Sequence, residues 1–222
     1  IDEPSIALAN CLGTQQIIAL SRRWKVRQIV HISSIGVIGR PIRAPIAEDH
    51  PVAPPTAYHA SKVFGEQLMD LATRDGTPAA SLRLTSPVGP GMAGNRILSV
   101  FVRRALAGEP LELAGSGTRR QDYVDVRDVA AGARACLEAR ATGLYNVAAG
   151  TSVSNRELAE LCVTIVGSTS PIRFPGKQDS EEGVDWNVSI AKAGRTFGYA
   201  PRHTLQETIH AVVADHAHRR DQ

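Results

Sequence analysis

Three short apolar runs, rich in valine, isoleucine and leucine, constrain the fold of this chain more than any other feature. They are "VRQIVHISS" (26–34), "AASLRLT" (79–85) and "GLYNVAAG" (143–150). Helical patterns lie before, between and after them. Apolar strands that alternate with helices are typical of a parallel sheet covered on both faces. The sequence therefore predicts an α/β fold with a doubly wound parallel sheet.

The remaining segments follow from apolar spacing and from the positions of glycine and proline. Five prolines between residues 36 and 56 predict an irregular loop. "LELAG" (111–115) predicts a further short strand. Helices are predicted over 5–24, 57–76, 96–107, 127–140, 154–166, 189–197 and 204–218.

Length, charge and cysteine content exclude several classes of protein. A chain of 222 residues suffices for one sizeable domain with a smaller lobe. The net charge of +3 is small and the basic pairs are scattered, which argues against nucleic-acid binding. Cys11, Cys136 and Cys162 lack disulfide or metal-ligand spacing, so we expect free thiols in a reducing compartment and no metal site.

Two further expectations concern location and chain start. No apolar run approaches the length of a membrane helix, and no signal peptide is visible, so we expect a cytoplasmic protein without a membrane partner. The chain starts at Ile1 rather than at a methionine, in a stretch that reads as the middle of a longer sequence. We therefore expect that an N-terminal portion precedes it in the complete protein.

Hydroxyl side chains stand where two of the predicted strands end. Binding sites of parallel sheets lie beyond the carboxyl ends of their strands. Those ends are Ser33-Ser34, Thr85-Ser86 and Ala148-Ala149. This edge of the sheet is therefore the predicted site.

Tyr58 and Lys62 stand four residues apart on a predicted helix, so their side chains share one face. A lysine ammonium near a phenol favours the phenolate by charge and hydrogen bonding. The pair is therefore a candidate general acid/base for a substrate hydroxyl. Ser34 is placed to hydrogen-bond the same hydroxyl.

Ordered blocks of the sequence carry a family resemblance. They are "HISSIGVIG", "AYHASKVFGEQL", "SLRLTSPVGPG", "FVRRALAGEPLEL", "GSGTRRQDYVDVRDVA" and "LYNVAAGTSVSNRELAEL". In order and spacing they resemble the NAD-dependent epimerase/dehydratases, the extended short-chain dehydrogenase/reductases, from about Asn10 to His210. The resemblance implies a Rossmann-type NAD(P)-binding domain over 1–86 and 119–150. It also implies a substrate-binding lobe over 87–118 and 151–222.

Roles for individual residues come from the same resemblance. It makes Ser34 the catalytic hydroxyl, Tyr58 the acid/base, and Lys62 both its partner and a ligand of the nicotinamide ribose. The residues implied in cofactor binding are Asn10, Ser33, Tyr58, Lys62, Thr85, Ser86 and Pro87. The residues implied in substrate binding are Ser34, Ser86, Asn95, Arg96, Arg120 and Lys177.

The chain departs from the family pattern in four places. Ser86 replaces a common asparagine, and Gln121 replaces the arginine that usually binds a substrate diphosphate, leaving Arg119 and Arg120 upstream. Ile35-Gly36 replaces the Asp-Glu of the dehydratases, which argues against sugar 4,6-dehydration. The family's glycine fingerprint would precede this chain.

Residues 89–94 read "GPGMAG", a literal match to the G-x-G-x-x-G pattern. A working fingerprint needs its first glycine directly after a strand and a helix N-terminus aimed at the pyrophosphate. Here Ser86, Pro87 and Val88 intervene, and Pro90 stiffens the loop. We therefore predict that this match is not a cofactor site.

The expected function is NAD(P)-dependent redox chemistry at a carbinol carbon of a sugar, foremost epimerisation of a nucleotide sugar. NAD is the expected cofactor, and NADP stays open. The alternatives are a dehydrogenase or reductase of a non-nucleotide sugar or hydroxy acid, and a catalytically idle binding protein. The resemblance also implies a homodimer through the helices at 5–24 and 57–75, with Ile17, Leu20, Phe64 and Leu68 as a candidate seam.

Overall fold

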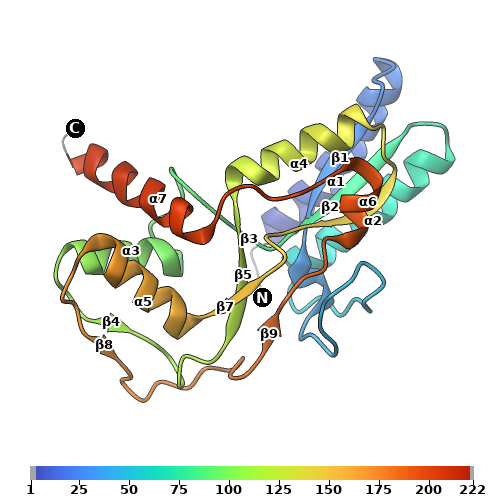
Figure 1. Cartoon of the computed structure of the whole chain (residues 1–222). Coiled ribbons are helices and arrows are strands. Elements are labelled where there is room, and N and C mark those ends of the chain that lie inside the picture. Colours follow the sequence, from blue (N-terminus) through green and yellow to red (C-terminus); the bar gives the residue numbers. More distant parts are fainter. Residues whose placement is uncertain (1–3, 221–222) are drawn as a thin grey trace.

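The computed structural model describes residues 4–220 as a mixed α/β fold (Figure 1). Its main sheet is parallel, with the strand order β1-β2-β6. The strands are β1 (Ile29–Ser34), β2 (Ala79–Leu84) and β6 (Gly143–Val147). The three predicted apolar runs thus form adjacent strands. The central strand β2 is buried along its whole length, whereas Ile32 of β1 is 40% exposed.

Helices cover both faces of this sheet. Ile29 and Ala79 face α1 (Pro4–Arg23) and α2 (Ala57–Arg74), where they pack with Met69 and Ala72. The alternate side chains of β2, such as Leu82, face α4 (Val126–Glu138) and α6 (Ala191–Phe197). Neighbouring residues of a strand point to opposite faces, which explains the two separate cores.

A second group of strands lies beside the main sheet. It consists of β3 (Ser86–Val88), β5 (Arg120–Asp125), β7 (Ser152–Ser154) and β9 (Asp185–Trp186), with β5 in contact with the other three. A separate pair joins β4 (Leu111–Glu112) to β8 (Ile172–Arg173). The core beside these strands is built from α3 (Ile97–Leu106), α5 (Asn155–Val166) and α7 (Leu205–Arg220).

The structure agrees with the predicted helices to within a few residues and adds strands that the sequence did not indicate. The longest of these, β5, carries Arg120, Gln121 and two aspartates, so it lacks the apolar run expected of a buried strand. Its Asp122 is fully buried because backbone amides and a threonine hydroxyl donate to it. Hydrogen bonding thus replaces apolar character in this strand.

The division into two domains stays a prediction. Ala193 and Tyr199 lie in the segment expected to belong to the substrate lobe, yet they pack against the main sheet with Val147. None of the helices within residues 4–220 is long and apolar enough to cross a membrane.

Candidate active site

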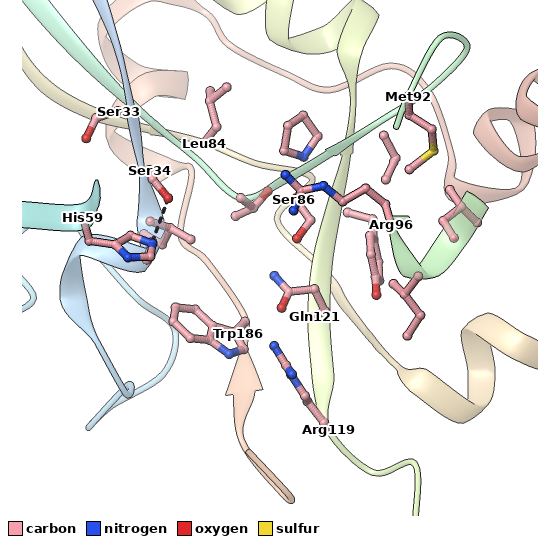
Figure 2. A pocket seen from close by; sticks show the side chains of 18 of the residues that line it. Ser33, Ser34, His59, Leu84, Ser86, Met92, Arg96, Arg119, Gln121 and Trp186 are labelled. Carbon is pink, nitrogen blue, oxygen red and sulfur yellow. Dashed lines mark hydrogen bonds between the residues drawn. The ribbon is translucent and has the colours of Figure 1, made fainter. Parts of the chain in front are cut away.

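A cavity of about 840 Å³ lies beyond the carboxyl ends of β1 and β2 (Figure 2). The N-terminal end of α2, the loop before α3, and strands β5 and β9 form its other walls. Its position at the carboxyl edge of a parallel sheet is the one expected for a ligand site. The residues that line it include Ser33, Ser34, Gly36, Tyr58, His59, Thr85, Ser86, Pro87, Asn95, Arg96, Arg119, Gln121, Tyr123 and Trp186.

The two serines at the end of β1 have different surroundings. The Ser33 hydroxyl is buried and donates to the carboxylate of Glu66 on α2 over 2.6 Å. The Ser34 hydroxyl accepts the N–H of Gly36 at 3.2 Å and caps the short 3₁₀ helix Ile35–Ile38. Ser34 therefore stands where the strand turns away, at the wall of the cavity.

The N-terminal turns of α2 bring Tyr58 to the cavity and Lys62 behind it. Thr56 caps the helix by accepting the N–H of His59. The Lys62 ammonium lies 5.7 Å from the centre of the Tyr58 ring and donates to the carbonyl of Ile32 at 3.0 Å. Burial lowers the pKa of Lys62 below its ordinary value. The predicted helical spacing thus places the ammonium close to the phenol ring.

Thr85 and Ser86 continue the wall after β2. The Thr85 hydroxyl donates to the Asp122 carboxylate at 2.8 Å, and the backbone amides of Ala149 and Gly150 donate to the same carboxylate at 2.8 Å each. Burial raises the pKa of Asp122 to about 6, although these hydrogen bonds oppose the shift. Asp122 thus ties together the chain segments that follow β2 and β6.

The alternation of β5 separates two neighbouring arginines. Arg119, Gln121 and Tyr123 line the cavity. Arg120 instead donates to the carbonyl of Ser152 at 2.6 Å and lies 3.1 Å from the Glu157 carboxylate. Successive side chains of a strand point to opposite faces, so only every second residue reaches the cavity.

The other predicted site residues are divided between the cavity and the surface. Asn95 and Arg96 line the cavity just before α3. Asn10, on α1, lies behind the cavity wall and donates to the Ser61 hydroxyl at 2.9 Å. Lys177 has 73% of its side chain exposed, and its ammonium lies 3.9 Å from Glu112. The roles assigned to all these residues stay predictions.

The GPGMAG loop has contacts unlike those of a phosphate-binding turn. Its Gly91 N–H donates to the Asp215 carboxylate of α7 at 3.0 Å. A carboxylate there places a negative charge where a pyrophosphate would need amide donors. The loop is also separated from α3, which begins only at Ile97.

Among the cavity residues that were not predicted site residues are His59, Arg119 and Trp186. His59 directly follows Tyr58, so its place at the helix N-terminus was the signal that could have found it. Arg119 follows from the alternation of β5 once that strand is known. Trp186 comes from a two-residue strand far along the chain, and nothing in its local sequence indicates the cavity.

The parallel sheet, its covering helices and the cavity at its carboxyl edge define a Rossmann-type α/β protein. Residues 2–148 match the family described as the NAD dependent epimerase/dehydratase family. The chain therefore belongs to this family, whose members use NAD.

Curated relatives agree with this assignment. The UDP-glucose 4-epimerase of Mycolicibacterium smegmatis is 30% identical over 220 residues, which are 96% of this chain and 69% of that protein. A dTDP-glucose 4,6-dehydratase of an Actinoplanes species is 29% identical over 210 residues, 93% of this chain and 65% of that protein. The chain thus spans about two thirds of the length of these relatives.

Solved structures show the same fold. A UDP-glucose 4-epimerase of Thermotoga maritima with UDP-glucose has a TM-score of 0.85 at 23% identity, over 96% of this chain and 71% of that chain. A UDP-N-acetylglucosamine 4-epimerase of Methanobrevibacter ruminantium in complex with UDP-N-acetylmuramic acid has a TM-score of 0.90 at 19% identity, over 96% and 70%.

The chemistry of the residues present fits the nicotinamide and ribose half of NAD, the cofactor of the family. Ile32, Leu84 and Pro87 give the cavity an apolar wall of the kind that a nicotinamide ring needs. The Lys62 ammonium has three N–H donors and uses one in the hydrogen bond to the carbonyl of Ile32, so two donors remain for a ribose hydroxyl.

Proposed function

We propose that this protein, in its complete form, is an NAD-dependent epimerase of a nucleotide sugar. The observation that carries the proposal is the arrangement of Ser34 and Tyr58 on one cavity wall, with the Lys62 ammonium 5.7 Å from the phenol ring. A hydroxyl that hydrogen-bonds both Ser34 and Tyr58 would lie at the carboxyl edge of the sheet, where this family uses its cofactor.

In the proposed reaction, each of these three side chains has its own role. Ser34 orients the substrate hydroxyl, and Tyr58, as phenolate, takes its proton. The Lys62 ammonium, 5.7 Å from the centre of the phenol ring, would be the charged partner of Tyr58 in this step. NAD, held by the residues named below, would supply the hydride chemistry that oxidises the carbinol carbon to a ketone and reduces it again from the opposite face. Tyr58 gives the proton back to the oxygen, and the carbon centre is inverted.

Cofactor contacts are proposed for the residues around this centre. Tyr58 and Lys62 would hold the nicotinamide ribose, while Thr85, Ser86 and Pro87 would lie along the nicotinamide. Ser33 lines the same wall. Asn10 would act from behind this wall through Ser61.

Two guanidinium groups in the cavity are the observation that favours a phosphorylated substrate. Arg96 and Arg119 line the same cavity from different elements, and guanidinium groups bind phosphate oxygens in pairs of hydrogen bonds. Arg120 and Lys177 lie outside this lining, so their proposed contacts would need a substrate that extends beyond it.

A second candidate is a dehydrogenase or reductase of a sugar without a nucleotide. Arg119 already forms an ion pair with Glu181 and lies 3.9 Å from Asp179, so much of its charge is neutralised. Gln121 is uncharged in the same wall. A smaller neutral substrate would suit this arrangement.

The test of the proposed function is the variant Tyr58→Phe of the complete protein. We expect kcat with UDP-glucose to fall by about 10²–10⁴-fold, because the general acid/base is lost. Folding, followed by circular dichroism, should stay unchanged. A variant that keeps more than a tenth of the wild-type kcat would remove Tyr58 from this role.

We also propose a cytoplasmic location. Its support is that Cys11, Cys136 and Cys162 are free thiols, two of them buried, as in proteins of reducing compartments.

A further inference from the structure

Asn155 is a buried polar residue of the cavity wall that the proposed reaction does not use. Only 9% of the residue is exposed, and it lines the cavity. Within residues 4–220, its carboxamide takes part in no hydrogen bond. A buried carboxamide without a partner costs stability, because its N–H groups and its oxygen have lost their hydrogen bonds to water. This side chain therefore points to a ligand in the cavity.

The start of α5 does not explain this carboxamide. The Ser154 hydroxyl accepts the backbone N–H of Glu157, and the Glu157 carboxylate accepts the backbone N–H of Ser154, so the capping box is complete. Asn155 comes next, as the first residue of the helix. Leucine has a higher helix propensity than asparagine, so helix formation does not favour asparagine at this position.

The pairing of β5 with β7 places Asn155 beside Arg119. The two strands are antiparallel, with Arg120 opposite Ser154. The pattern continues by one residue, because the Asn155 N–H donates to the Arg119 carbonyl at 2.9 Å. Directly opposed residues on one face of such a pair have Cβ atoms about 4.5–5.5 Å apart. Since Asn155 and Arg119 both line the cavity, their side chains are neighbours on its wall.

Gln121 adds a second carboxamide to this wall. It follows Arg119 by two residues on β5, and Figure 2 shows both side chains extending from this strand into the cavity. The Gln121 side chain is half-buried and has no hydrogen-bond partner in the part of the chain that the structure describes. Arg119 already forms an ion pair with Glu181. The wall thus offers two carboxamides without partners next to a cation whose charge is shared.

We propose that Asn155 binds the substrate, and that its carboxamide, together with that of Gln121, donates N–H groups to the diphosphate. Each carboxamide has two N–H donors, and phosphate oxygens accept such bonds strongly because they are charged. Arg119 beside Asn155, and Arg96 in the same cavity, supply the positive charge. This inference rests on the proposed function and deepens it, because it assigns neutral donors to the diphosphate.

The first test measures binding of UDP and of inorganic pyrophosphate to the complete protein by titration calorimetry. Leucine has nearly the shape of asparagine but no donor, so we expect Asn155→Leu to weaken both ligands by about 10-fold, the effect of one hydrogen bond to a charged group. Asn155→Asp should weaken both further, because a carboxylate repels phosphate. Gln206→Leu is the control, since Gln206 is exposed on α7, outside the cavity lining.

Three results of this test would overturn the proposal. Asn155→Leu with weaker UDP binding but unchanged pyrophosphate binding would show that the residue contacts the nucleoside. Unchanged affinity for both ligands would show that it contacts neither. Asn155→Asp with wild-type affinity would contradict donation to phosphate.

The second test separates binding from a structural role. Without ligand, we expect Asn155→Leu to unfold at the same temperature as the wild type or higher, because leucine buries no polar group. A fixed concentration of UDP should raise the Tm of the wild type more than that of the variant. A variant that is less stable without ligand would show that the carboxamide supports the fold instead.

Failure of the proposed function gives different results. Turnover retained by Tyr58→Phe would overturn the proposed mechanism and leave the diphosphate contact standing. A wild-type protein that binds neither UDP nor pyrophosphate would overturn the nucleotide-sugar substrate, and the contact of Asn155 with it.

Discussion

The half-buried ring of His31 leads us to expect that acid destabilises this protein. It lies on β1, with Nδ1 3.3 Å from the Ser81 hydroxyl and its ring packed against Gly65 of α2. Burial is the main cause that lowers its pKa to about 4, and the nearby Lys62 ammonium adds to the shift. The folded state therefore holds His31 neutral at a pH at which the unfolded chain protonates it.

The sign of the pH effect follows from this depressed pKa. Above about pH 6.5 both states bind no proton, and the stability contribution of His31 is fully present. It is lost as the pH falls from about 6.5 to about 4, by at most about 3 kcal/mol, because each pH unit is worth about 1.4 kcal/mol.

We therefore expect His31→Asn to flatten the pH dependence of stability between pH 7 and 5. Urea unfolding at both pH values measures it, and the exposed His210, changed to Asn, is the control. A wild-type chain that is equally stable at both pH values would contradict the prediction.

At the scale of elements, a buried ion pair joins α2 to the sheet. Arg83 of β2 and Glu66 of α2 meet at 2.8 Å with only 3% and 10% of their side chains exposed. Ser33 donates to the same carboxylate. Removal of one partner leaves the other charge buried without compensation, which is costly.

We expect Arg83→Met to destabilise the protein by about 3–5 kcal/mol, measured by urea unfolding. The double variant Arg83→Met with Glu66→Leu should recover most of that loss, because it leaves no unpaired charge. A double variant as unstable as the single one would show that the pair contributes through something other than charge.

The neighbouring residues Arg119 and Arg120, at the start of β5, lead to a second prediction at this scale. Arg119 lines the cavity, whereas Arg120 bonds Ser152 and Glu157. Arg119→Ala should weaken UDP-glucose binding by about 10-fold or more, since a charge-assisted hydrogen bond is worth about 1.5–3 kcal/mol. Arg120→Ala should leave this affinity nearly unchanged, and calorimetry on both variants decides. The reverse order of effects would restore Arg120 to the substrate site.

At the scale of the whole molecule, α1 and α2 pack together and leave apolar side chains uncovered. Ile17 and Leu71 are about half exposed, and Leu8 and Leu12 are exposed on α1. Exposed apolar patches on paired helices are typical of interfaces between copies. We propose that this face forms a homodimer, with Leu20, Phe64 and Leu68 at its border.

We expect the complete protein to be a dimer at micromolar concentration, by light scattering, and Ile17→Lys with Leu71→Lys to make it monomeric. A polar substitution on the far side of the molecule, Leu137→Lys on α4, is the control. A wild-type monomer at this concentration would contradict the prediction.

The sequence by itself determined the three main strands, their helices and the family, because apolar periodicity and ordered motifs are local properties of the chain. It also determined that Tyr58 and Lys62 share a helix face, since that follows from helical spacing alone. The separation of Arg119 from Arg120 was decided only by the tertiary structure. The polar strand β5 forms because groups distant in the sequence, such as the Thr85 hydroxyl and the Gly150 amide, donate hydrogen bonds to the buried Asp122 carboxylate. The alternation of side chains along the strand then determines which arginine reaches the cavity. The places of His59 and Trp186 had the same origin, because a cavity wall joins residues that only folding brings together.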